Sequence, residues 1–85
     1  MERILSAAVL LYGVVMSLPA PARHHDILAK IRPLYLSPIG GDMQGFLTTT
    51  GRFVSRREAV AIAKVAGQID EPKFQPNALF SEDLW

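Results

Sequence analysis

The 85-residue sequence contains no cysteine, which excludes a disulfide framework and a zinc site built from thiolates. The simplest interpretation of such a chain is a protein of the cytoplasm. The sequence also lacks the glycine-rich loops that bind nucleotide phosphates, the G-x-S-x-G motif that presents a nucleophile, and a close carboxylate pair. These absences argue against a conventional enzyme, and we expect no cofactor.

The chain has little net charge, because nine lysines and arginines face eight aspartates and glutamates. The charges are unevenly distributed. Residues 1–68 carry eight basic and four acidic side chains, a net charge of +4, and residues 69–85 carry one and four, a net charge of −3. A whole-chain charge of +1 is too small for a protein that coats long nucleic acid. The basic body suits a small anionic ligand better.

Long unbroken apolar runs are also lacking. The beginning of the chain imitates a secretory signal peptide in composition, but Tyr12-Gly13 divides its apolar run into two pieces of strand length, and Glu2 accompanies Arg3 at its start. We therefore predict a β-hairpin over residues 1–18 and no membrane segment. Its strands are expected at residues 4–11 and 14–18.

The two prolines of residues 19–22 are expected to make a stiff extended connector. A helix is predicted over residues 22–32, because the apolar residues of this segment share one helical face. These residues are Ile27, Leu28 and Ile31. The helix is expected to end before Pro33, which cannot continue it. Residues 33–43 show no helical or strand period and are expected to form a loop, apolar enough to cover the core or to meet a second subunit.

Residues 44–68 hold the clearest local signals. Two short strands around a turn at Gly51 predict a second hairpin, since glycine accepts a positive φ angle. Ser55 and Glu58 have the spacing of a capping box, which places the start of a helix near Arg56. The helix has a face of small and apolar residues and a stop at Gly67; that face consists of Ala59, Ile62, Ala63 and Ala66.

Residues 69–85 are expected to form a docked C-terminal arm, because a large aromatic such as Trp85 is rarely left in water. The fold class that follows is α+β: a small single domain in which two β-hairpins form an antiparallel sheet packed with two helices and the docked arm. A chain this short buries only about 60% of its unfolded surface, so we expect a homo-oligomer.

The ordered pattern PARHHDI, QGFLT…GRFV-R-EA-IA-AGQ and LFSEDLW extends over almost the whole chain. In this pattern the chain resembles a family of small, functionally uncharacterised proteins of tailed bacteriophages and prophages. The resemblance implies a phage-encoded protein that acts in the cytosol of the host cell. It implies no particular activity.

The first candidate site is Arg23-His24-His25 at the start of the first helix, where free N–H groups and the helix dipole favour an anion. The two imidazoles could instead serve as acid and base, or His24 could pack against the core with Arg23 in solvent. Neighbouring side chains on a helix point about 100° apart, so a metal site is not expected.

The second candidate site is the basic cluster of Arg52, Arg56 and Arg57, since arginines at a helix N-terminus oppose the dipole unless an anion binds there. Gln44 and Gln68 flank this cluster and could recognise a base edge. Phe46 could stack on a ligand ring, although phenylalanines in strands more often belong to the core.

Together, these residues predict a protein that binds a phosphorylated small molecule. In the phage setting that the resemblance implies, we expect a counter-defence protein that sequesters such a molecule, for example a nucleotide-derived immune signal. One alternative is a small phosphodiesterase-type enzyme that degrades the signal with His24 and His25. Another is a protein–protein inhibitor of a host defence enzyme that uses the loop and the LFSEDLW arm.

Overall fold

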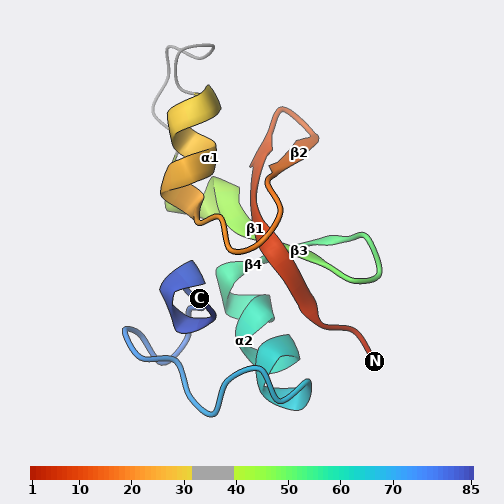
Figure 1. The fold of residues 1–85 in the computed structure, drawn as a ribbon, viewed down its shortest axis with the longest axis vertical. Coiled ribbons are helices and arrows are strands. Elements are labelled where there is room, and N and C mark those ends of the chain that lie inside the picture. The colour runs from red at the N-terminus through yellow and green to blue at the C-terminus, as the bar shows by residue number, and fades with distance from the viewer. Residues whose placement is uncertain (32–39) are drawn as a thin grey trace.

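The computed structural model describes residues 1–31 and 40–85 (Figure 1). Four strands form one antiparallel sheet in the order β2-β1-β3-β4. Their bounds are Ile4–Leu11 for β1, Val14–Ser17 for β2, Gln44–Thr48 for β3 and Phe53–Ser55 for β4. Two α-helices, α1 at His24–Ile31 and α2 at Arg56–Val65, complete the α+β fold that the sequence predicts.

The first hairpin is confirmed, because β1 pairs with β2 from Ala8 opposite Ser17 to Leu11 opposite Val14. Its turn places both Tyr12 and Gly13 at positive φ, 50° and 77°, as the type I′ turn of a two-residue hairpin loop requires. The central strand β1 then pairs with β3 on its other side. An irregularity in that pairing between Ile4 and Ser6 leaves Leu5 exposed on the sheet.

The extended connector predicted at residues 19–22 is wrong. The N–H of Ala22 donates to the carbonyl of Pro19 at 3.1 Å, which closes a turn, and the Ala20–Pro21 peptide is cis. Prolines fit turns as well as extended segments, so composition alone could not separate the two. The helix α1 follows at His24, and the carboxylate of Asp26 accepts the N–H of Arg23 at 2.8 Å before its first turn.

The predicted start of α2 is confirmed. Ser55 Oγ accepts the N–H of Glu58 at 3.1 Å, and Glu58 Oε1 accepts the N–H of Ser55 at 2.9 Å, so both halves of the capping box are present. The fully buried Ala59 and Ala63 let the helix approach the sheet closely. After α2, Gly67 adopts a φ of 74° and ends the helix.

One core holds the sheet and both helices together. Its centre is a row across the sheet, Ala7, Phe46 and Val54, which are register partners and all fully buried. Three apolar side chains of α1 and the small face of α2 cover this row on one side of the sheet. The predicted loop at residues 33–43 lies outside the described residues up to position 39, and Gly41–Met43 forms a short 3-10 helix, η2.

The arm docks on its own chain. Leu79 is fully buried in the core, and its N–H donates to the carbonyl of Arg56 at 2.9 Å. A 3-10 helix, η3, follows at Ser81–Asp83, and in Figure 1 this C-terminal part of the chain, in blue, lies below α1 and beside the upper part of α2. The indole N–H of Trp85 donates to the carbonyl of Ala22 at 3.0 Å.

Candidate functional site

The starts of α1, β3 and α2 meet the arm at one junction, and His24 lies in its interior with only 6% of its surface exposed. Its Nε2 is 2.7 Å from the carbonyl oxygen of Gly45, and its Nδ1 is 3.3 Å from Ser81 Oγ. Burial lowers the pKa of His24, which favours the neutral imidazole. Both ring nitrogens therefore have hydrogen-bond partners within the chain.

Phe46 packs edge-on against His24, with ring centroids 5.0 Å apart and an interplanar angle of 82°. It is fully buried at the centre of the core. The structure thus places this candidate stacking residue beneath the junction, where its ring faces protein atoms.

His25, in contrast, points to solvent, with 72% of its side chain exposed and its Nε2 3.3 Å from a carboxylate oxygen of Asp26. The turn of the helix separates the two neighbouring imidazoles, as the 100° spacing predicts. Of the pair, only His25 is accessible to a ligand.

Arg23 anchors the arm. Its Nε donates to the main-chain oxygen of Trp85 at 2.8 Å, and its Nη2 donates to the same oxygen. Together with the bond from the Trp85 indole to Ala22, this makes a reciprocal link between the start of α1 and residue 85. The guanidinium of Arg23 is consequently committed to tertiary structure.

Arg56, the first residue of α2, has the least complete set of partners at the junction. Its Nη2 donates to Gln44 Oε1 at 2.8 Å, and its guanidinium carbon lies 4.7 Å from the centroid of the Phe80 ring. Its Nε is buried, and no atom of residues 1–31 or 40–85 forms a hydrogen bond with it. The backbone of Gly41 is so close that a β-carbon added there would lie 3.5 Å from Nη1.

Desolvation lowers the pKa of Arg56, and Glu82 partly opposes this effect. Among the described residues, no carboxylate oxygen lies within 4.0 Å of a guanidinium nitrogen of Arg56, so none forms a salt bridge with it. Removing a guanidinium from water without a directly paired anion is unfavourable. Arg56 is therefore a partly desolvated cation without a directly paired carboxylate among the described residues.

Arg52 lies at the other end of β4 and is fully engaged by Glu2. Its Nε and Nη2 bind the two carboxylate oxygens of Glu2 at 2.7 and 2.8 Å, and the hydroxyls of Thr48 and Thr50 each donate to Glu2 Oε2 at 2.6 Å. The bond from Arg52, followed by those from the threonines, lowers the pKa of Glu2 to about 2. An anion could reach Arg52 only by displacing Glu2.

The structure therefore separates the residues that the sequence grouped as sites. Arg56 and Gln44 are in contact, and His24 lies within electrostatic reach of Arg56. Gln68 lies elsewhere, with both ends of its side-chain amide bonded to the main chain of Ile4. Arg57 is exposed beside Arg56 on the first turn of α2.

Sequence reasoning missed Ser81, Glu82 and Phe80 as members of the junction and Glu2 as the partner of Arg52. The available signal was the charge distribution, since an acidic arm on a basic body favours contact between them. Ser81 Oγ donates to Glu82 Oε1 at 2.8 Å, and this bond is the main cause of the lowered pKa of Glu82.

Two further properties bear on the kind of site. In the described part of the chain, no group of three or more metal-binding side chains comes together. Over residues 1–31 and 40–85, no helix is long and apolar enough to cross a bilayer.

A family model described as Phage T4 y16D protein matches residues 3–85. No curated protein and no solved structure matches the chain.

Proposed function

We propose that this chain, which belongs to the Phage T4 y16D protein family, is a phage accessory protein that binds a phosphorylated small molecule at Arg56. The family match confirms the resemblance to small phage proteins and supports a phage setting. The family description states no activity, so the argument for the ligand comes from the side chains.

The observation that carries the proposal is the incomplete coordination of Arg56. Its guanidinium is partly desolvated, and the part of the chain that the structure describes supplies neither a hydrogen-bond partner for its buried Nε nor a directly paired carboxylate. Phosphate oxygens match the planar donors of arginine and can accept two parallel bonds from them. A phosphate here would also lie at the N-terminal end of α2, where the helix dipole favours negative charge.

The surroundings of Arg56 suit a small ligand. Gln44 adds an amide beside the guanidinium, and Phe80 supports the guanidinium from below through its ring. Our proposal is that the ligand is nucleotide-derived, with its phosphate at Arg56 and its base edge toward Gln44. In the phage setting, holding such a molecule would remove an immune signal from the host cell.

Sequestration is favoured over hydrolysis because the junction offers poor acid–base machinery. Both nitrogens of His24 are occupied by Gly45 and Ser81, and its lowered pKa disfavours the protonated form. General acid–base catalysis needs a group that can exchange a proton with the ligand. Inhibition of a host enzyme through the arm is also less favoured, since Leu79 and Trp85 are used within the chain.

Calorimetric titration with inorganic phosphate and with mono-, di- and cyclic nucleotides tests the proposal. We expect wild-type protein to bind at least one nucleotide, and Arg56→Gln to weaken that binding by roughly ten- to a hundredfold, because a charge-assisted bond contributes about 1.5–3 kcal/mol. The exposed neighbour Arg57→Gln is the matched control and should leave affinity nearly unchanged. Gln44→Ala provides a second variant if Arg56→Gln unfolds.

Recovery of the bound nucleotide after denaturation separates sequestration from hydrolysis. An intact nucleotide supports sequestration, and a cleaved one supports an enzyme. Wild-type protein that binds neither phosphate nor any nucleotide of the panel overturns the proposal.

A further inference from the structure

The strand β2 forms one edge of the sheet. Leu11 and Val14 flank the two-residue turn and make a hydrogen-bonded pair, so the next pair, Leu10 and Val15, does not exchange hydrogen bonds. The N–H and C=O groups of Val15, and by the same alternation those of Ser17, point away from β1. In the described residues, no hydrogen bond from outside the hairpin reaches these groups.

This edge lacks the charges and the proline that often protect an edge strand. The sequence of β2, VVMS, contains no charge and no proline, and Val14 and Val15 are 55% and 39% exposed. The opposite edge differs, because β4 has only three residues and lies between Arg52 and Arg56. Of the two edges, β2 is therefore the one suited to bind another strand.

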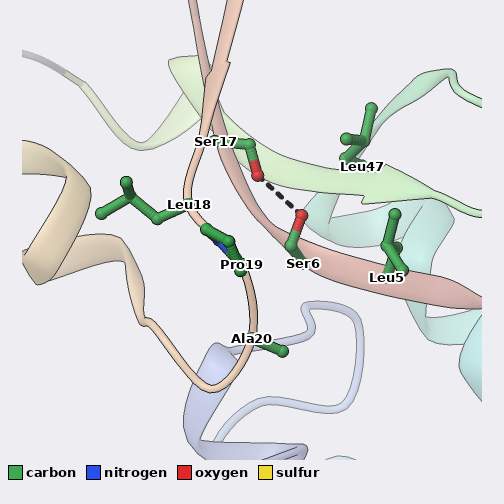
Figure 2. A pocket seen from close by; sticks show the side chains of 7 residues that line it. All are labelled: Leu5, Ser6, Ser17, Leu18, Pro19, Ala20 and Leu47. Carbon is green, nitrogen blue, oxygen red and sulfur yellow. Dashed lines mark hydrogen bonds between the residues drawn. The ribbon is translucent and has the colours of Figure 1, made fainter.

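Apolar cavities border β2 on both faces of the sheet. On the face away from the helices, a cavity of about 530 Å³ has Leu5, Leu18 and Leu47 in its walls, and a bond of 2.6 Å joins Ser17 Oγ to Ser6 Oγ (Figure 2). On the helix side, a cavity of about 340 Å³ lies between β2 and α1, beside Met16 and Ile27. Since side chains of a strand alternate between faces, a strand added beside β2 would reach toward both cavities.

We propose that this edge pairs with β2 of a second copy of the chain, antiparallel about a two-fold axis at Met16. In this register Val15 lies opposite the partner's Ser17, so the outward N–H and C=O groups of both residues are satisfied in each copy. The two four-stranded sheets become one sheet of eight strands, with the helices of both copies on the same face. Arg56 and the junction lie outside this interface, so the inference does not depend on the proposed ligand.

A second copy fits this edge because β2 is compatible with itself. An uncharged apolar strand meets no like charge when it pairs with its own copy, whereas like charges directly opposite each other would be destabilising. In this register the exposed Val15 also lies diagonally across from the partner's Val15, so part of its apolar surface is covered along the seam. The interface is small, so we expect a dimer that dissociates on dilution.

Sedimentation velocity and native mass spectrometry over a range of concentrations test the pairing. Wild-type protein should dimerise, and Val15→Lys, which places a charge on the edge, should weaken the dimer at least about tenfold. The matched control is Val65→Lys, at an apolar residue of α2 that is 74% exposed, and it should dimerise like wild type. A wild-type protein that is monomeric throughout, or a Val15→Lys variant that dimerises as strongly as wild type, overturns the proposal.

Cross-linking tests the register and does not require Val15→Lys to fold. The chain has no cysteine, so Met16→Cys introduces a single thiol beside the two-fold axis. Facing residues of a non-hydrogen-bonded pair have β-carbons about 4.5–5.5 Å apart, close to the distance of a disulfide. Mild oxidation should convert Met16→Cys to a covalent dimer well before Val65→Cys; equal rates for the two variants contradict the proposed pairing.

Discussion

The side-chain amide of Gln68 binds both main-chain polar groups of Ile4. The N–H of Ile4 donates to Gln68 Oε1 at 2.8 Å, and Gln68 Nε2 donates to the carbonyl of Ile4 at 2.9 Å. These two bonds connect the residue after the α2 stop to the first residue of β1, 64 positions earlier in the chain. The amide thus completes the main-chain pairing of the sheet where β1 begins.

Replacing Gln68 by alanine should lower the free energy of unfolding by about 1–3 kcal/mol, since each of the two bonds contributes roughly 0.5–1.5 kcal/mol. Urea denaturation followed by circular dichroism measures this loss. Lys64→Gln is the control, because it breaks the ion pair between Lys64 and Glu71. The side chain of Glu71 is 72% exposed, and such surface ion pairs contribute little to the free energy of unfolding. Equal stabilities of the two variants would contradict the role of Gln68.

The arm should contribute strongly to stability through Leu79, which is fully buried. Leu79→Ala should cost about 2–5 kcal/mol, because it removes apolar contact and leaves a cavity. The matched control is Leu5→Ala, at a leucine that is 50% exposed, and it should cost clearly less. Truncation after Asn77 removes the whole arm and should lower the melting temperature further; an unchanged melting temperature would show that the arm is dispensable.

The stability of the protein should depend on pH through His24. Burial lowers its pKa below the ordinary 6.5, so the unfolded chain binds a proton at a higher pH than the folded chain. The free energy of unfolding is therefore highest above pH 6.5 and falls as the pH drops from there toward the folded pKa. His24→Gln should remove this part of the pH dependence, and the exposed His25→Gln should retain it. Denaturant titrations across this pH range measure the free energy of unfolding of each variant. If it depends on pH in His24→Gln as it does in wild type, the prediction is contradicted.

A second pH dependence should arise at lower pH from Glu2. Its pKa is lowered from 4.5 to about 2 in the folded chain by Arg52 and the two threonines. This stabilisation is complete above pH 4.5 and is lost as the pH falls toward 2. Glu2→Gln should therefore flatten the stability profile in that window. Arg52→Ala removes the other partner and should shift the midpoint of the Glu2 titration, followed by NMR, back toward 4.5.

The sequence alone determined the local structure of this protein. The pair Tyr12-Gly13 predicts the first hairpin, and Ser55 with Glu58 predicts the start of α2, because these signals act between residues at most a few positions apart. The small face of α2 and the burial of the arm also follow from local pattern and composition. The connector at residues 19–22 was missed because prolines are compatible with both a turn and an extended segment.

Only the tertiary structure decided which charged and polar side chains are free. Arg52 is paired with Glu2 from 50 positions away, and Arg23 with Trp85 from 62 positions away. His24 and His25 look equivalent in sequence, yet only His24 turns into the core. Whether a polar group is satisfied depends on the long-range contacts that folding creates, so no local pattern could single out Arg56 among the arginines.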